Sequence, residues 1–380
     1  MKFNWQTKKL GEICNISIGK TPPRSDKSFW DSKKETNNIW LSIRDLKNKK
    51  GKIIYDSSEY VSDKGANLFK KVSRGTLLAS FKLTLGRLAF AGSDLRTNEA
   101  IAALKIIDEK KIDSQYLYYF LSYFDWEAAT KGDVKIKGKT LNKAKLKKID
   151  IIYPPLPEQK RIVKILDEAF EKLEIAKENA EKNLGNAQEL YESYLHEVFS
   201  SSDNDWEAHT LGKCFRLKSG ENLTRKKMDS SGNIKVYGGN GIVGLHSKSN
   251  LKGDNIIIGR VGALCGIVRH ITEEIWLTDN AFKVIDCKYE FDNKFLTCLL
   301  NYKNLRRLAR QAAQPVISNS SLKSLILEFP TSVNKQKKLA NKFEKIRNTV
   351  NSNKINYKKK INAIDELKKS ILQKAFSGEL

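Results

Sequence analysis

The chain has 380 residues, of which 40% are hydrophobic, so it is long enough and apolar enough for two packed domains. Its 69 Lys and Arg against 44 Asp and Glu give a net charge of +25, which is typical of proteins with a polyanionic partner, above all nucleic acid. The five cysteines form no CxxC pair and the four histidines have no metal-ligand spacing, which argues against a metal site or a disulfide framework. No segment approaches the ~18 apolar residues of a membrane span, so we expect a cytoplasmic protein without a membrane segment.

The two halves of the chain are related in sequence. NWQTKKLGEICNISIGKTPPR, from Asn4, matches DWEAHTLGKCFRLKSGENLTR, from Asp205, with Trp, Leu-Gly, Gly and Arg in register. Five matches in the same order indicate a duplicated unit of about 180 residues, each copy consisting of a domain and an appended segment. The other four pairs begin at Thr97 and Thr278, Tyr116 and Phe295, Leu146 and Leu322, and Glu189 and Glu366.

Residues 132–140 of the first copy, GDVKIKGKT, resemble a nucleotide-binding loop only superficially. Five residues separate the two glycines where a P-loop has four, and the preceding FLSYFDWEAATK favours a helix rather than a strand. On an extended segment, however, three ammonium groups would share one face, which suits a phosphate backbone. These belong to Lys135, Lys137 and Lys139. A basic turn in solvent is the alternative interpretation.

Two stretches that contain no proline, 158–199 and 331–380, are free to be helical. Apolar residues recur in both at steps of three and four, which is typical of coiled-coil seams. Residues 154–200 carry a net charge of −4 and residues 331–380 a net charge of +9, so the two helices are electrostatically complementary. We expect them to pair with each other and to hold two globular segments apart. If each were a separate surface helix instead, a long apolar seam would be exposed.

The loops of both copies are glycine-rich and basic. Four glycines in YGGNGIVG, 237–244, favour turns rather than a regular strand or helix. IIIGRVGALCGIV, 256–268, predicts buried strands joined by turns, with Arg260 exposed, and its counterpart in the first copy is LLASFKLTLGRLAF. Arg, Lys, Asn and Thr on short turns suit contacts with base edges and phosphates, although surface charges without a partner would look the same.

No pattern of catalytic residues is present. YPPL, 153–156, is faintly similar to the NPPY-type loop of amino-methyltransferases, but it lacks the leading Asp or Asn and the glycine-rich cofactor loop. The nucleophile elbow, the HExxH zinc motif and the kinase signatures are also missing. We therefore predict neither an active site nor a metal or cofactor on this chain.

Five motifs in a fixed order carry a resemblance that covers nearly the whole chain. They are the duplicated Leu-Gly openings, WLSIRDL (40–46), YGGNGIVG, PPLPEQKRIVKILD (154–167) and the closing LKKSILQKAFSGEL (367–380). In this order they resemble the specificity (S) subunits of type I restriction-modification systems. The second junction, EFPTSVNKQKKLA, departs from the pattern and keeps only Pro330 and Gln336.

The resemblance implies two target-recognition domains, each of which reads one half of a split sequence in double-stranded DNA. It also implies that the helices dock two methyltransferase (M) subunits, which carry S-adenosylmethionine and methylate adenine, and that the complex recruits ATP-driven restriction (R) subunits. A stand-alone DNA-binding regulator is the alternative, and an ATP-dependent enzyme is a third. The partner-docking residues implied are Pro155, Leu156, Gln159 and Gln336.

We accordingly predict an α+β fold with an internal pseudo-two-fold duplication. Two similar mixed α/β target-recognition domains, 1–153 and 201–330, would be held apart by two long antiparallel coiled-coil helices, 154–200 and 331–380. Candidates for phosphate contacts are Lys135, Lys137, Lys139 and Arg225; candidates for base contacts are Arg44, Arg87, Tyr237, Asn240 and Arg260; Lys20, Arg24, Lys82, Thr84 and Gln314 complete the predicted DNA surface.

Overall fold

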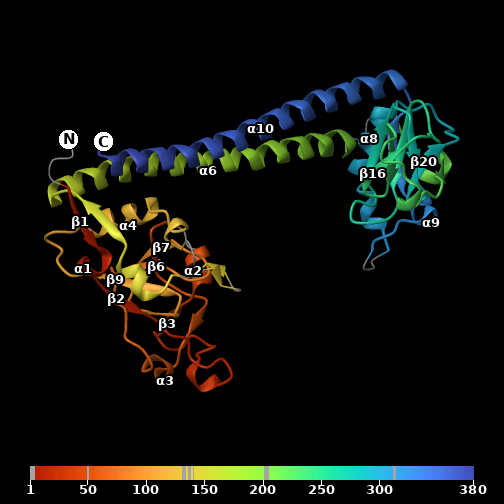
Figure 1. Ribbon diagram of the computed structural model, residues 1–380. Helices are drawn as coiled ribbons and strands as arrows, with labels where there is room; N and C mark the ends of the chain where they lie inside the picture. Colours follow the sequence, from red (N-terminus) through yellow and green to blue (C-terminus); the bar gives the residue numbers. More distant parts are fainter. Residues whose placement is uncertain are drawn as a thin grey trace. The chain divides into compact units, whose positions relative to one another are not determined.

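The structure is a computed structural model that describes residues 5–48, 51–130, 141–200, 205–310 and 314–380. Between residues 131 and 140 it describes only the backbone of β10 (Val134–Lys135) and β11 (Gly138–Lys139). The chain divides into two compact units, and both long helices contribute to each of them (Figure 1). The first unit comprises Met1–Asn179 and Lys360–Leu380, and the second comprises Ala180–Lys359.

The first unit contains a larger and a smaller sheet. The larger has the order β2 (Cys14–Ile18), β9 (Ile101–Ile106), β6 (Leu77–Ser80), β7 (Leu88–Ala91) and β4 (Ile53–Ile54). The smaller has the order β5 (Glu59–Tyr60), β3 (Ile39–Leu41) and β8 (Arg96–Thr97). Every residue of β6 and β7 is buried, because both faces of these apolar strands pack in hydrophobic clusters. The short helices beside these sheets are α2 (Ile43–Asn48), α3 (Asp63–Ala66) and the 3-10 turns Lys27–Phe29 and Ala128–Thr130.

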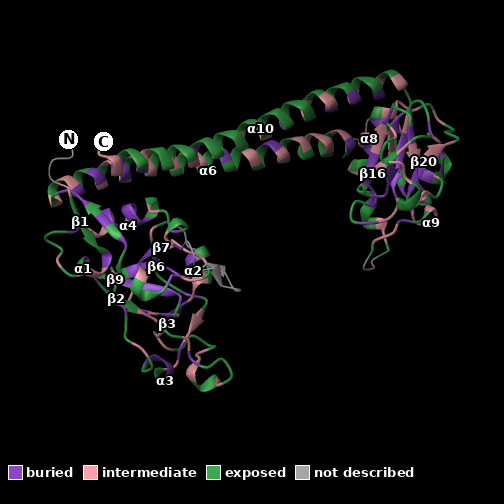
Figure 2. Ribbon diagram, viewed as in Figure 1, coloured by how far each residue is buried: buried purple, intermediate pink, exposed green. Residues whose placement is uncertain are grey.

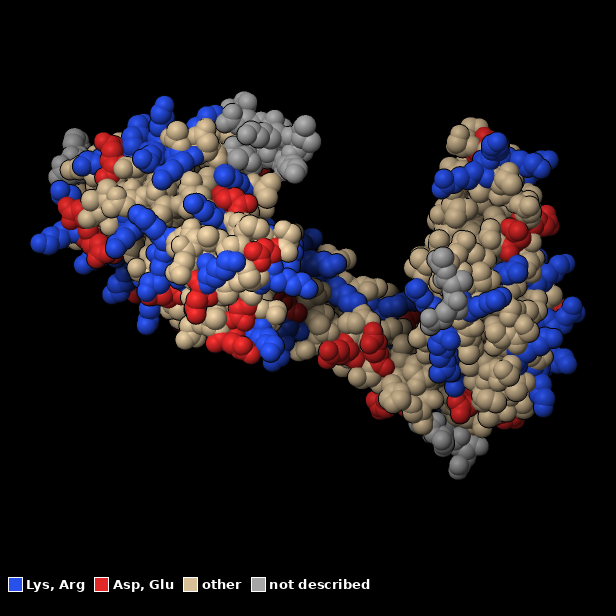
Figure 3. Space-filling model, turned by 90° about the horizontal axis from the view of Figure 1, so that it is seen from below, with Lys and Arg blue, Asp and Glu red and all other residues tan. Residues whose placement is uncertain are grey.

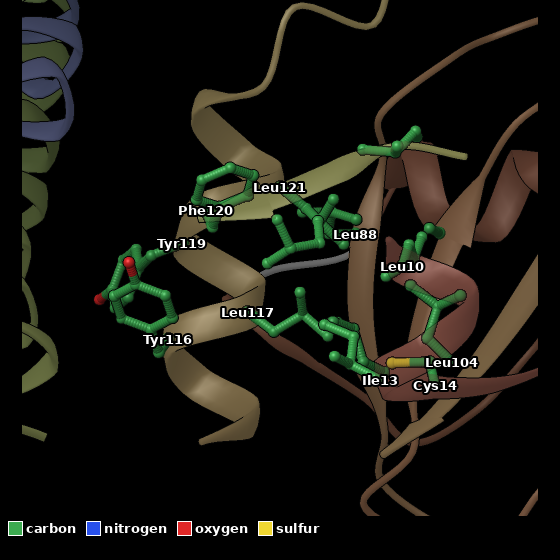
Figure 4. Close-up of a cluster of buried hydrophobic side chains, with 14 of the residues drawn as sticks. Leu10, Ile13, Cys14, Leu88, Leu104, Tyr116, Leu117, Tyr119, Phe120 and Leu121 are labelled. Atoms are coloured by element: carbon green, nitrogen blue, oxygen red, sulfur yellow. The ribbon is translucent and has the colours of Figure 1, made fainter. Parts of the chain in front are cut away.

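Helix α4 (Ser114–Tyr123) packs between the larger sheet and the long helices of this unit. The carboxylate of Asp113 caps it by accepting hydrogen bonds from the backbone N–H groups of Gln115 (2.8 Å) and Tyr116 (2.9 Å). Leu117 and Leu121 point toward the sheet, while Tyr116 and Tyr119 point the opposite way (Figure 4). The core of the first unit therefore continues through α4 to the helical pair.

The helix predicted across FLSYFDWEAATK is shorter than expected. Helix α4 ends at Tyr123, and Phe124 already has an extended backbone, with ψ near 135°. Only the 3-10 turn Ala128–Thr130 follows. The aromatic ring of Trp126 is pulled into the core instead, where its Nε1–H donates to the carbonyl of Leu121 at 2.8 Å, and this tertiary contact overrides the helical pattern.

The second unit repeats the plan of the first, as the duplication predicts. Its sheets have the orders β14-β20-β17-β18 and β16-β15-β19, and the first of these matches β2-β9-β6-β7. Helix α8 (Asn293–Tyr302) is capped by Asp292, as α4 is by Asp113. The strands are β14 (Arg216–Ser219), β15 (Ile234–Gly238), β16 (Gly241–His246), β17 (Asn255–Gly259), β18 (Val268–Ile271), β19 (Ile275–Leu277) and β20 (Ala281–Ile285), and the 3-10 turns are Arg225–Lys227 and Leu305–Leu308.

The expectation that YGGNGIVG would not form a regular strand is wrong. Its residues form the end of β15 and most of β16, which pair as an antiparallel hairpin with a register shift at Val236/Tyr237. Gly238 pairs with Gly241, which leaves Gly239 and Asn240 as a two-residue loop. The glycines are needed here for close approach, because a Cβ on Gly239 would lie 1.9 Å from the carbonyl oxygen of Val261.

Each copy is closed by a two-stranded ladder that brings its beginning to its end. In the first, β1 (Gln6–Lys9) pairs with β12 (Asp150–Tyr153); in the second, β13 (Trp206–Thr210) pairs with β21 (Ile326–Pro330). The Leu of each Leu-Gly opening is buried, and its N–H donates across the ladder at 2.8 Å, from Leu10 to Ile149 and from Leu211 to Leu325. The flanking helices are α1 (Leu10–Ile13), α5 (Lys143–Lys147), α7 (Leu211–Cys214) and α9 (Asn319–Lys323).

The two long helices, α6 (Leu156–Ser200) and α10 (Val333–Ser377), have 45 residues each. In the first unit Lys177 bonds Asp365 (2.8 Å) and Glu174 bonds Lys368 (2.5 Å), so the helices are antiparallel there. In the second unit Tyr194 packs on Phe343, while Gln188 accepts a hydrogen bond from Lys354, which gives the same direction. On both helices buried and half-buried residues recur among exposed ones, as expected when one side of each helix packs (Figure 2).

Candidate nucleic-acid interface

Basic side chains are spread over the face of each domain that Figure 3 shows. Residues 1–153 carry a net charge of +14 and residues 201–330 a net charge of +6. A phosphate backbone attracts such surfaces regardless of sequence, whereas sequence is read by particular side chains. Whether each predicted side chain can contact DNA therefore depends on whether it is already bonded to another group of the chain.

Lys82, Thr84 and Arg87 lie on one loop, residues 81–87, which joins β6 to β7. The backbone N–H groups of Ser80 and Arg87 bond across its base, to the Arg87 carbonyl and to Oγ of Ser80, both at 2.9 Å. In the described part of the chain, neither Lys82 nor Arg87 has a carboxylate partner. Their charges are available to a ligand that approaches this end of the sheet.

Of the next two predicted residues, Lys20 is exposed, whereas Arg24 is already paired within the chain. Lys20 is exposed, and its carbonyl accepts from Nε1 of Trp40 at 3.0 Å. Arg24 forms a two-pronged ion pair with Glu59, and its guanidinium lies 4.0 Å from the ring centroid of Trp30. Arg24, Trp30 and Glu59 line a pocket of about 400 Å³ together with Lys34. The charge of Arg24 is thus already balanced within the chain.

Arg44 is exposed on α2, beside the buried Asp45. Oδ2 of Asp45 accepts from N and Oγ of Ser42 (2.8 and 2.7 Å), and Oδ1 accepts from N and Oγ of Ser58 (2.9 and 2.8 Å). Burial alone would raise the pKa of Asp45, but the hydrogen bonds from Ser58 and Ser42 outweigh it, and the pKa lies below its ordinary value. This carboxylate fastens α2 to the loop before β5 and so positions Arg44.

Tyr237 and Asn240 are on the β15–β16 hairpin, but neither presents a free side chain. Tyr237 is 8% exposed, and its ring packs with Ile257 and Ile275, so the structure leaves little of this predicted base contact to a ligand. The side-chain oxygen of Asn240 accepts the N–H of Leu264 at 2.9 Å, and thereby ties the hairpin loop to the loop after β17. Only the amide nitrogen of Asn240 remains for a ligand.

Arg260 is half-buried rather than exposed. Its Nη1 lies 3.4 Å from the Asp279 carbonyl, its guanidinium carbon lies 5.4 Å from the ring centroid of Phe282, and its Nε is buried. No hydrogen-bond partner for that Nε exists among the residues described. An unsatisfied N–H costs free energy, which a ligand that reaches it would recover.

Arg269 on β18 has a similar environment, and the sequence analysis missed it. Its Nη1 is buried without a partner in the described part of the chain, and burial lowers its pKa. Its Nη2 lies 3.3 Å from the position that a Cβ on Gly241 would take, so the guanidinium stands against the hairpin. An arginine that follows the apolar residues Ile267 and Val268 was the available signal.

The remaining predicted residues are exposed or undescribed. Arg225 opens an exposed turn with three consecutive basic residues, and Gln314 is exposed. Sequence analysis also missed the exposed pair Arg306 and Arg307, which the run LRRLAR could have indicated. The side chains of Lys135, Lys137 and Lys139 lie outside the described residues; the backbone of β10 and β11 forms an antiparallel pair rather than one extended segment.

The residues predicted to dock a partner fall into two groups. Pro155 is exposed and Leu156 is half-buried at the start of α6, so both can be reached. Gln159 and Gln336 have no exposed surface, and the prediction that they contact a partner is wrong. Gln159 accepts the N–H of Asp113 at 2.9 Å and donates to the carbonyls of Lys111 and Pro154, both at 2.8 Å.

Gln336 makes the equivalent three hydrogen bonds in the second unit. It accepts the N–H of Asp292 at 2.9 Å and donates to the carbonyls of Pro330 (2.9 Å) and Glu290 (3.3 Å). Each glutamine therefore joins the first turn of a long helix to the cap of the shorter helix of its own domain. The PPLPEQ motif and its weaker copy share this glutamine for a structural reason.

The described residues contain neither a metal-binding cluster nor a membrane-spanning helix. No three His, Cys, Asp or Glu residues are grouped there so as to hold a metal ion. None of the helices described is both long and apolar enough to span a membrane.

Comparison with known proteins decides the family. The family model described as "Type I restriction modification DNA specificity domain" matches residues 3–184 and again residues 203–363. The chain belongs to this family. The two matches cover the two copies found in the sequence, so this chain carries two DNA specificity domains of the type I restriction-modification family.

The chain is also similar to individual members of the family. It is 25% identical to the type I restriction enzyme EcoprrI specificity subunit of Escherichia coli over 364 residues, which are 90% of this chain and 88% of that protein. It is 25% identical to the MjaIX specificity subunit of Methanocaldococcus jannaschii over 247 residues, which are 59% of this chain and 55% of that one.

Solved structures share the fold. One, from a study of complex assembly and conformational transition of the type I R-M system, has a TM-score of 0.78 at 16% identity and covers 99% of this chain and 98% of its own. The crystal structure of the HsdS subunit from Thermoanaerobacter tengcongensis has a TM-score of 0.60 at 16% identity and covers 99% and 97%.

Proposed function

We propose that this chain is the DNA-recognition subunit of a type I restriction-modification complex and that it reads a bipartite target in double-stranded DNA. The observation that carries the proposal is the repeated specificity domain, each copy with the same strand order, the same capped helix and a basic surface. Two readers in one chain suit two half-sites separated by unread base pairs. The long helices, each continuous over 45 residues, would set the length of that gap.

The chemistry of the complex would belong to partner subunits. Two methyltransferase (M) subunits would dock on the long helices, one near Pro155 and Leu156 at the start of α6 and the other near the start of α10. They would supply S-adenosylmethionine. Restriction (R) subunits would supply ATP-driven cleavage. This chain would itself be non-catalytic, with no cofactor of its own, and would act in the cytoplasm beside the chromosome.

Within each domain the proposed division of labour follows the contacts described above. Cations without a carboxylate partner in the described part of the chain, such as Lys82, Arg87 and Arg225, are proposed to hold phosphates or base edges. Lys20, Arg44, Thr84, Gln314 and the undescribed lysines 135, 137 and 139 remain proposed contacts. Arg260 and Arg269 would complete their hydrogen bonding on DNA.

Mapping methylated adenines tests this function in cells that express the chain with its methyltransferase subunits. We expect every modified adenine to lie in one two-part motif with a constant gap. A continuous motif, or methylation by the purified chain alone, would contradict the proposal. A stand-alone DNA-binding regulator, the alternative, would instead form a stable, sequence-specific complex with DNA in the absence of M subunits.

A further inference from the structure

Leu83, at the tip of the loop between β6 and β7, has a backbone conformation that leucine normally avoids. Its φ is +65°, and the N–H of Thr84 donates to the carbonyl of Lys82 at 2.7 Å, so Leu83 is the central residue of a γ-turn of the strained kind. Of the four non-glycine residues with positive φ in the described part of the chain, Leu83 is the apolar one. Such strain is kept only where the surroundings impose it, and it gathers at functional sites.

The second copy shows what stability alone would select at this position. The carbonyl of Phe81 accepts the N–H of Leu141, and the carbonyl of Arg260 accepts the N–H of Ile317, so Phe81 and Arg260 are equivalent. Two residues later the first copy has Leu83 and the second has Gly262, whose φ is +103°. Glycine takes this conformation without the steric cost. The second copy therefore has a glycine at the equivalent position of this loop, where the first copy has a strained leucine.

The leucine side chain contributes nothing visible to the core. It is 58% exposed, whereas Phe81 is fully buried and Leu85 packs against the core of the first unit. The indole of Trp126 lies against Gly86, close enough that a Cβ there would be 2.5 Å from the ring. A single exposed leucine is ordinary. A strained leucine on a firmly held loop, with its side chain projecting outward, is not.

The chemistry around Leu83 identifies its partner. Lys82 precedes Leu83 and Arg87 ends the same loop, and neither has a carboxylate partner within the described chain, so the loop combines an apolar tip with two cations. Duplex DNA has the matching surface, because apolar base edges and the thymine methyl group lie between rows of phosphates. We propose that Leu83 is a specificity-determining residue that makes an apolar contact with the bases of one half-site. This inference rests on the proposed function.

The test uses the full-length chain in complex with its methyltransferase subunits and a library of random-sequence DNA duplexes, from which bound duplexes are selected and sequenced. Leu83→Asn keeps a residue that tolerates positive φ but removes the apolar tip, Leu83→Met keeps the tip, and Leu83→Gly removes both tip and strain. Ile107→Ala is the matched control, since Ile107 is 53% exposed and follows β9 at the opposite end of the sheet.

We expect wild type, Leu83→Met and Ile107→Ala to select the same two-part motif. Leu83→Asn and Leu83→Gly should lose preference at one base step of one half-site by about tenfold, with an unchanged salt dependence. Leu83→Gly should also raise the Tm of the first unit by about 2 °C, because relief of strain exceeds the added chain entropy.

The outcomes separate the two proposals. If Leu83→Asn selects the wild-type motif with undiminished preference, the role of Leu83 is refuted while the proposed function stands. If the wild-type complex selects no motif, the proposed function is at fault and the inference fails with it. A uniform loss of affinity for all duplexes, with preferences intact, would make Leu83 a structural residue and refute its role in reading bases.

Discussion

The two units of this protein share a scaffold and differ in what the scaffold carries. Asp113 and Asp292 cap equivalent helices, and Gln159 and Gln336 tie those caps to the long helices by the same three hydrogen bonds. At the sheet ends the copies diverge: the position of Phe81 holds Arg260. The contacts that build the domain are thus kept in both copies, while loops that face solvent are free to change, and this is the pattern expected of two readers with different targets.

The largest expected effect comes from the loop of the β15–β16 hairpin in the second unit. Gly239→Ala places a Cβ 1.9 Å from the carbonyl oxygen of Val261, and the backbone must move to relieve the clash. We expect the second unit to lose about 3 kcal/mol or more of unfolding free energy and the first to lose none. Hydrogen exchange, followed by mass spectrometry in each unit, measures this.

The matched control lies in the same unit. Gly185→Ala, on α6, meets nothing within 4 Å and should stabilise the helix by about 1 kcal/mol. If hydrogen exchange in the second unit of the Gly239→Ala variant were as slow as in the wild type, the hairpin would not be packed against the loop after β17.

The glutamine clamps test whether the scaffold is truly shared. Gln159→Ala leaves a buried N–H and two carbonyls without partners, and should cost the first unit about 2–3 kcal/mol. Gln336→Ala should cost the second unit a similar amount, with each loss read from the exchange of α4 or α8. Gln373→Ala, at an exposed position of α10, should have no effect. A large loss in one unit alone would break the equivalence of the copies.

Asp45 gives a smaller, pH-dependent effect that should be confined to the first unit. Its pKa is lowered in the folded state, so its contribution is complete above the unfolded pKa near about 4 and is lost as the pH falls through the folded pKa. Asp45→Asn should therefore cost about 1–2 kcal/mol at neutral pH, and the difference from wild type should shrink in acid. A difference that grew as the pH fell would reverse the assigned sign.

The smallest effect is expected where the helices pair. Lys368→Ala removes an ion pair with Glu174 whose side chains are 25% and 57% exposed, so it should cost about 0.5 kcal/mol and less at high salt. Lys374→Ala, an exposed change on the same helix, is the comparison. A cost that persists in high salt would mean that the lysine acts through packing rather than charge.

Sequence reasoning succeeded where the signal is local or repeated. The duplication appeared in aligned motifs, and the helices, observed at Leu156–Ser200 and Val333–Ser377, follow from proline-free periodic stretches. It failed where the answer depends on packing between distant segments. Gln159 and Tyr237 looked like surface residues but are buried by strands and helices far away in sequence, and the strained φ of Leu83 has no mark in the sequence at all.

The central claim is that each domain independently reads its own half of a divided target. The most direct measurement replaces residues 205–330 with a second copy of residues 5–153 in the full chain, co-expresses it with the methyltransferase subunits, and maps methylated adenines. We predict a motif that contains the first unit's half-site twice, once on each strand, with the second unit's half-site absent. Retention of the original second half-site would contradict the account.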